Sequence, residues 1–144
     1  MNIDQLKPTD LEQLSKLYQQ LIPNEISLVK MEEVFARNRD NENHLVLTAK
    51  EGKALKGAIL MSITEMFFGQ CKSFMVIEDF VVDKDHRGKG IGKALMEAAE
   101  KIAASRNVSY IMLITDMDRE DSRKFYHAMG YQSEGYCAFK KHLK

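Results

Sequence analysis

The sequence predicts a mixed α/β fold in which helices flank one central, mostly antiparallel sheet. Residues 44–83 hold three strand-like segments joined by short turns, which is typical of an antiparallel meander. An amphipathic helical pattern then runs from Ile91 to about Ser105, and a buried strand pattern follows at residues 110–115. A strand, helix and strand in this order form a right-handed crossover, so we expect residues 73–83 and 110–115 to be parallel.

The other elements follow from periodicity and from capping residues. Thr9-Asp10 offers an N-cap to a first helix, which Pro23-Asn24 ends, and Gly130 suits the left-handed residue just after a helix. The expected helices cover residues 11–21, 26–39, 91–105 and 121–129. The expected strands cover residues 1–6, 44–49, 54–68, 73–83, 110–115 and, as one or two strands, 131–140.

Length and composition predict a single domain, residues 1–144. The 21 basic and 21 acidic residues balance, which gives no argument for a nucleic-acid partner or an anionic membrane. No apolar run approaches the roughly 20 residues of a membrane helix, and the first residues do not resemble a signal peptide, so we expect a cytoplasmic protein. The histidines and the two cysteines lack ligand spacing, so we expect no metal, and we expect Cys71 and Cys137 to be buried.

A glycine-rich basic loop separates the third meander strand from the long helix. It reads Asp83-Lys84-Asp85-His86-Arg87-Gly88-Lys89-Gly90-Ile91-Gly92-Lys93. The glycines expose backbone N–H groups and permit positive φ values, and the loop lies at the positive end of the helix dipole. Because no acidic residue lies between Arg87 and Glu97, the segment predicts a diphosphate site.

Two common phosphate motifs do not fit this loop. A Walker loop needs Ser or Thr after Gly92-Lys93, where Ala94 stands, and a dinucleotide fingerprint needs Gly-x-Gly-x-x-Gly in a parallel sheet. The pattern Arg/Gln-x-x-Gly-x-Gly/Ala does fit, and it resembles the GCN5-related N-acetyltransferase (GNAT) family. The resemblance implies the GNAT fold and acetyl-CoA as co-substrate. It implies that the cofactor is held by Phe80, Val81, Val82, Arg87, Gly88, Lys89, Gly90, Ile91, Gly92, Lys93 and Ser122.

A second motif carries the resemblance to the catalytic groups. The segment from Phe125-Tyr126 to Gly130-Tyr131 matches the family pattern Phe-Tyr-x-x-x-Gly-Phe/Tyr. The match implies that Tyr126 is the general acid that protonates the departing thiolate. Arg119 stands where many relatives have asparagine, which departs from the pattern.

Two carboxylates stand inside an apolar strand, where they are costly unless they are paired or functional. Strand alternation places Glu78 with Val76, Phe80 and Val82 on one face, and Asp79 with Ile77 and Val81 on the other. The pair resembles family members that acetylate polyamines and amino sugars. The resemblance implies that Glu78 is the base and that Glu78 and Asp79 bind the acceptor; the alternative is that both are structural.

Together these features predict an N-acetyltransferase that moves acetyl from acetyl-CoA to a primary amine by direct attack, without an acetyl-enzyme. The expected acceptor is a small molecule: a polyamine, an amino sugar or an amino acid derivative. Acetylation of a protein N-terminus or lysine is one alternative, and a non-catalytic CoA-binding sensor is another. A homodimer is compatible with the resemblance.

Overall fold

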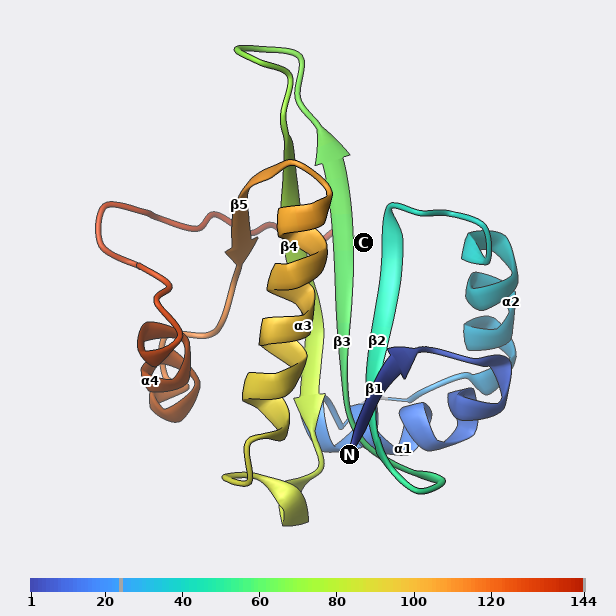
Figure 1. Ribbon diagram of the computed structural model, residues 1–144. Helices are drawn as coiled ribbons and strands as arrows, with labels where there is room; N and C mark the ends of the chain where they lie inside the picture. Colours follow the sequence, from blue (N-terminus) through green and yellow to red (C-terminus); the bar gives the residue numbers. More distant parts are fainter. Residues whose placement is uncertain (24, 144) are drawn as a thin grey trace. The chain divides into compact units, whose positions relative to one another are not determined.

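The computed structural model describes residues 1–23 and 25–143 (Figure 1). The chain forms two compact units, residues 1–112 and a smaller one from Leu113 onward. The first unit carries nearly all of the sheet and three helices, and the second carries one helix and the C-terminal segment.

Five strands form one sheet in the spatial order β1-β2-β3-β4-β5. Neighbours from β1 to β4 are antiparallel, and β4 and β5 are the parallel pair, so the predicted mixed sheet with one crossover is confirmed. The strands are β1 (Asn2–Gln5), β2 (His44–Glu51), β3 (Ala54–Glu65), β4 (Ser73–Val82) and β5 (Val108–Leu113).

Two helices of the first unit cover opposite faces of the sheet. Ala58 of β3 packs against three buried leucines of α1, whereas the adjacent Gly57 lies against Leu95 of α3. Adjacent strand residues point to opposite faces, so α1 and α3 lie on different sides. The helices are α1 (Leu11–Leu21), α2 (Leu28–Asn38), α3 (Ile91–Ser105) and α4 (Glu120–Ala128).

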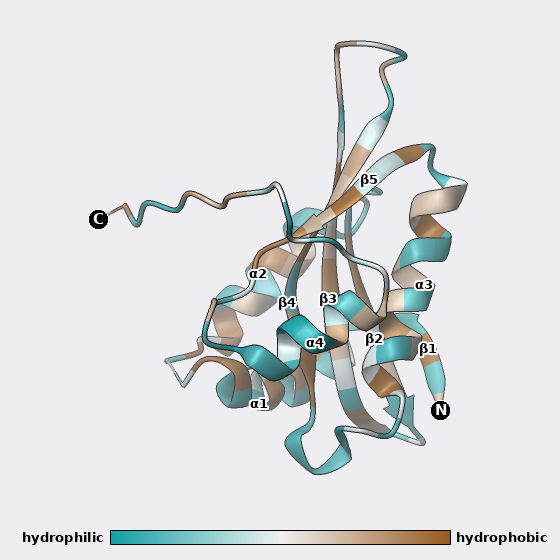
Figure 2. Cartoon of the chain, turned by 90° about the vertical axis from the view of Figure 1, so that its left-hand side faces the viewer, coloured by the Kyte–Doolittle hydropathy of each residue, from teal (hydrophilic) through white to brown (hydrophobic). Residues whose placement is uncertain are grey.

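The apolar pattern explains how α1 and α3 bind the sheet. Helix α1 buries Leu11, Leu14 and Leu17 on one stripe, and α3 buries residues spaced three and four apart from Ile91 to Ala103. In Figure 2, β3 and β4 are mostly apolar, while α3 alternates apolar and hydrophilic residues as an amphipathic helix does. Each fully buried leucine contributes about 2 kcal/mol, so these stripes hold the helices in place.

A buried ion pair anchors the start of α1. Asp10 is only 5% exposed; its carboxylate contacts Lys50 Nζ at 2.7 Å and accepts the Lys7 backbone N–H at 2.8 Å. Asp10 is the N-cap residue by position, but its side chain makes no cap hydrogen bond to the helix. The carboxylate instead ties α1 to β2 and to the residues that follow β1.

The predicted final strand at residues 131–140 is wrong. The structure assigns no strand to this segment, and Tyr136 and Phe139 are 76% and 91% exposed. Apolar and polar residues follow one another here as in a strand, but a strand also needs a neighbour for its backbone groups. Alternation along the chain carries no information about such a neighbour.

The tip of the β3–β4 hairpin also differs from the prediction. Strand β3 ends at Glu65 rather than residue 68, and Phe67 and Phe68 are exposed. Cys71 at this tip and Cys137 are both exposed, so the expectation of buried cysteines is wrong. Within the described residues, no helix has the length and apolar character that crossing a membrane requires.

Candidate active site

The glycine loop has the conformation that its sequence predicts. After β4 a short 3-10 turn covers Lys84–His86, and Gly88 and Gly90 then take φ values of +75° and +86°. Only glycine adopts such values without strain, so these two positions require it. Gly92 lies in the first turn of α3, outside the positive-φ set.

The start of α3 presents unpaired donors to this loop. The Ala94 N–H bonds the Gly90 carbonyl at 3.0 Å, and the N–H groups before it have no acceptor within the helix. Gly90 is the N-cap and offers no side chain, and the first turn holds no acidic residue. A Cβ at Gly88 or Gly90 would meet no atom within 4 Å, so the space beside both is open. These features fit a pyrophosphate.

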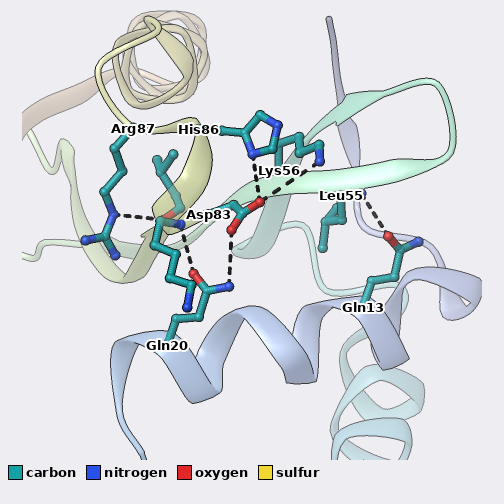
Figure 3. Close-up of polar contacts among 9 residues, drawn as sticks. Gln13, Gln20, Leu55, Lys56, Asp83, His86 and Arg87 are labelled. Carbon is teal, nitrogen blue, oxygen red and sulfur yellow. Dashed lines mark hydrogen bonds and ion pairs between the residues drawn. The ribbon is translucent and has the colours of Figure 1, made fainter.

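The entrance of the loop is fixed by a network around Asp83 (Figure 3). Its carboxylate lies 2.8 Å from His86 Nδ1 and 4.0 Å from Lys56 Nζ, and it accepts a hydrogen bond from Gln20 Nε2 at 3.2 Å. Burial acts to raise the pKa of Asp83, but hydrogen bonds from Gln20 and His86 outweigh it and lower the pKa overall. Asp83 therefore remains a carboxylate well below neutral pH.

The side chains of the predicted cofactor residues fall into three groups: buried, hydrogen-bonded to the backbone, and exposed. The side chains of Val81 and Ile91 are buried in the core, which leaves only their backbone groups for a ligand. Arg87 Nε donates to the Val82 carbonyl at 3.1 Å, which ties the arginine to the end of β4. Lys89 and Lys93 are both exposed, and Lys93 Nζ also forms an ion pair with Glu97 Oε1 at 3.8 Å, one turn later in α3.

Gly57 is a site residue that the sequence reasoning missed. A Cβ there would lie 3.0 Å from Leu95 Cδ1, 3.0 Å from the Val81 carbonyl and 3.2 Å from Ile91 Cγ2. Its absence lets the first turns of α3 lie close against β3. A glycine inside a strand pattern is the signal that could have identified it.

Gly57→Ala is expected to lower the free energy of unfolding by about 1–3 kcal/mol, because the new methyl group overpacks this contact. Since Ile91 opens α3, the same change should displace the donors of the loop and weaken binding of acetyl-CoA. Urea unfolding and calorimetric titration measure the two effects. A variant with wild-type values in both would show that the contact relaxes freely.

Strand β4 carries a β-bulge beside the acidic pair. Residues 58–60 of β3 span the same length as residues 78–81 of β4, so β4 has one extra residue at Asp79-Phe80. Asp79 has a φ of +48°, which is uncommon for a residue other than glycine. Uncommon backbone of this kind is often found at functional sites.

The bulge corrects the predicted faces of β4. Glu78 lies opposite Leu60, and Val81 lies opposite Ala58 and packs against α1. Leu60 and Ala58 share a face of β3, so Glu78 and Val81 share the α1 face although an even number of residues separates them. The predicted grouping of Glu78 with Val82 is therefore wrong.

A cavity of about 1380 Å³ lies in the first unit, between α1, α2 and the sheet. Asp79 lines it together with Tyr18 of α1. Both residues also line an adjoining recess of about 240 Å³, whose other walls are apolar: Leu21, Ile22, Ile26 and Met31. Glu78 is exposed and lies outside both linings.

The cavity changes the acidity of the groups that face it. Partial burial against the cavity raises the pKa of Asp79 above its ordinary value, although its side chain, like that of Glu78, is exposed to solvent. Burial, and then the charge of Asp79, raise the pKa of Tyr18, so this phenol stays neutral. A carboxylate in apolar surroundings is stabilised by a cation, and an ammonium group would supply one.

Strand β4 extends past the end of its parallel neighbour. Phe74 of β4 stacks on Tyr110 of β5 with ring centroids 5.6 Å apart, so these two residues lie side by side in the neighbouring strands. Strand β5 ends three residues later, at Leu113, while β4 continues to Val82. The last residues of β4, which include the bulge, therefore run beyond β5.

The second unit carries Tyr126 on α4. The helix ends as predicted: Gly130 has a φ of +91°, its N–H bonds the His127 carbonyl at 3.0 Å, and the Tyr131 N–H bonds the Tyr126 carbonyl at 3.0 Å. The Tyr126 ring makes edge contacts with Phe125 and Tyr131. Burial raises the pKa of Tyr126 more than the nearby Arg119 lowers it, so the phenol keeps its proton at neutral pH. Ser122 lies on the same helix, one turn before it.

Solved structures share this fold. An acetyltransferase from Trypanosoma brucei superposes with a TM-score of 0.86 at 23% identity, with 99% of each chain covered. Glucosamine-6-phosphate N-acetyltransferase from Arabidopsis thaliana gives a TM-score of 0.85 at 21% identity over 97% of each chain. At these identities the likeness shows the fold.

The sequence itself shows the family. It matches the acetyltransferase (GNAT) family over residues 11–131, so the chain belongs to this family. A 51-residue segment is 41% identical to YxbD of Bacillus subtilis (strain 168), which is named an uncharacterized protein. That segment spans 35% of this chain and 32% of YxbD. Family and fold together support acetyl transfer.

Proposed function

We propose that the protein transfers the acetyl group of acetyl-CoA to a primary amine of a small molecule. The loop that opens α3 carries the proposal: Gly88 and Gly90 take positive φ, and the first turn of the helix is free of acidic residues. In a member of this family, such a loop suits the pyrophosphate of acetyl-CoA.

Acetyl-CoA supplies the acetyl thioester, and different groups of the chain would bind different parts of it. Backbone N–H groups of residues 88–93 would hold the pyrophosphate, with charge from Arg87, Lys89 and Lys93. Backbone groups of residues 80–82 would hold the pantetheine arm, and Ser122 would add a hydroxyl. We propose these binding roles from the geometry of the loop and from the family resemblance.

Asp79 is our first candidate for the group that binds and deprotonates the acceptor. An amine arrives largely as ammonium at neutral pH and must lose a proton before it attacks a carbonyl. Asp79 lines the cavity, and its raised pKa makes it a stronger base than an ordinary carboxylate. Glu78, the base that the resemblance implies, is the second candidate.

Tyr126 is the proposed general acid. A phenol that keeps its proton at neutral pH can donate it to a departing thiolate, which restores charge balance after the amine has lost its own proton. The ammonium gives one proton to the carboxylate before it attacks, and the nitrogen loses a second proton once it has bonded the carbonyl carbon. The C–S bond then breaks, Tyr126 protonates the departing sulfur, and the second proton restores the phenol. The carboxylate releases its proton to solvent, so the cycle closes without an acetyl-enzyme.

The apolar recess beside Asp79 favours an acceptor whose amine is attached to a hydrocarbon part. Its walls suit a polyamine or an amino acid derivative better than an amino sugar, whose hydroxyl groups would lose hydrogen bonds to water there. A lysine side chain also has such a hydrocarbon part, so a protein acceptor is the second candidate.

The test is acetyl-CoA-dependent release of CoA thiol with a panel of amines. The panel holds a polyamine, an amino sugar, an amino acid derivative and a lysine-containing peptide. We expect amine-dependent release with a small-molecule member that exceeds release with the peptide. Tight binding of acetyl-CoA without thiol release for any amine would favour the sensor alternative instead.

A further inference from the structure

Two glutamines on α1 make the same kind of clamp at two different places. Gln13 Oε1 accepts the Leu55 N–H at 2.9 Å, and its Nε2 donates to the Lys53 carbonyl at 3.0 Å. Gln20 Oε1 accepts the Lys84 N–H at 2.9 Å, and its Nε2 donates to Asp83 Oδ1 at 3.2 Å. The two residues lie about two turns apart on one side of the helix.

The two clamps hold different segments. Gln13 holds the β2–β3 turn, which is part of neither the cavity lining nor the glycine loop. Gln20 holds Asp83 and Lys84, the residues at which β4 ends and the loop begins. Figure 3 shows both amides reaching from α1 toward these two segments.

Backbone hydrogen bonds hold Asp83 at the entrance of the loop, and Gln20 holds the next residue, Lys84. The Asp83 N–H bonds the Lys56 carbonyl at 2.8 Å, and the His86 N–H bonds the Asp83 carbonyl at 2.9 Å. These bonds fix Asp83 to β3 and to the turn that follows it. The Lys84 N–H is held from the side of α1, by Gln20.

We propose that Gln20 is a positioning residue for the pyrophosphate loop. It holds the entrance of the loop against α1, so that Gly88, Gly90 and the first turn of α3 are already arranged before acetyl-CoA binds. Pre-arrangement of this kind raises affinity because less freedom is lost on binding. The inference rests on the proposed function, since it takes acetyl-CoA as the ligand of the loop.

The experiment compares Gln20→Ala with the matched control Gln13→Ala. Each change removes one amide that accepts a backbone N–H and donates one hydrogen bond, to the Lys53 carbonyl from Gln13 and to the Asp83 carboxylate from Gln20. Calorimetry measures the Kd of acetyl-CoA, and hydrogen exchange of the ligand-free protein measures the two held segments. We expect Gln20→Ala to raise the Kd about threefold to tenfold and Gln13→Ala to leave it within about twofold.

Hydrogen exchange should separate positioning from general stability. Gln20→Ala should speed exchange in residues 84–90 and leave residues 53–56 unchanged, and Gln13→Ala should do the reverse. Equal Kd values in the two variants, with wild-type exchange at residues 84–90 in Gln20→Ala, would overturn the inference. If the wild-type protein itself does not bind acetyl-CoA, the proposed function fails, which is a distinguishable result.

Discussion

Asp79→Asn is expected to lower kcat/KM for the amine by about 10²- to 10⁴-fold, the usual contribution of a general base. The change removes the carboxylate that lines both the cavity and the apolar recess, and it keeps the size of the side chain. The loop that opens α3 is untouched, so the Kd of acetyl-CoA should stay within about twofold. Because most amines become neutral near pH 10, the deficit should shrink as the pH rises toward that value.

Glu78→Gln is the matched control, because it changes the neighbouring carboxylate in the same strand. Glu78 lies outside the cavity lining, whereas Asp79 is part of it, so we expect the kcat/KM of Glu78→Gln to stay within about threefold of the wild type. The opposite outcome, a large loss in Glu78→Gln and a small one in Asp79→Asn, would make Glu78 the base. Initial rates of thiol release at several acceptor concentrations and pH values give kcat/KM for both variants.

Asp79→Asn should also make the protein more stable at neutral pH. The pKa of Asp79 is raised in the folded state above its ordinary value of 3.8, so the folded protein binds this proton more tightly than the unfolded chain does. The wild type therefore loses stability as the pH rises from about 4 through the raised pKa, and asparagine removes this loss. Urea unfolding at pH 4 and 7.5 should show a gain at pH 7.5 only; an equal gain at both would point to another cause.

Tyr126→Phe is expected to lower kcat by about 10²-fold or more, because the phenylalanine cannot protonate the departing thiolate. The Kd of acetyl-CoA should change little, since the ring and its edge contacts with Phe125 and Tyr131 remain. A split of this kind, with kcat lost and binding kept, indicates a group that acts in the transition state.

Tyr131→Phe is the control for the loss of a phenol. It removes a hydroxyl from the ring that contacts Tyr126, at a motif position where phenylalanine also satisfies the family pattern. We expect wild-type kcat. If Tyr126→Phe keeps wild-type turnover while Tyr131→Phe is slow, the general acid has been assigned to the wrong tyrosine.

Features that depend on local sequence were predicted well. The glycines at 88 and 90, the start of α3 and the left-handed Gly130 all follow from residues that lie next to one another. The order of the strands from β2 to β5 also follows, because short turns force β2, β3 and β4 to be antiparallel and the crossover helix makes β4 and β5 parallel. The pairing of β1 with β2 does not follow in this way, since α1 and α2 lie between them in the chain.

Features that depend on pairing with distant segments were not predicted. The bulge at Asp79-Phe80 exists only in the register between β3 and β4, and it decides which carboxylate lines the cavity. The clamp of Gln20 joins residues that are more than 60 positions apart. Residues 131–140 show the converse: a good strand pattern without a strand. The periodicity of a sequence predicts which residues share a face of a helix or strand, but it does not predict which segments lie beside that element.

The central claim is that the loop before α3 binds acetyl-CoA, and titration of the melting temperature with acetyl-CoA tests it most directly. Binding to the folded state stabilises it by about 2.7 kcal/mol at a hundredfold excess over the Kd. We predict a rise in melting temperature that continues with acetyl-CoA concentration as mass action requires, and little change with NAD, which shares the diphosphate and the adenosine. No rise at millimolar acetyl-CoA, or an equal rise with NAD, would contradict the account.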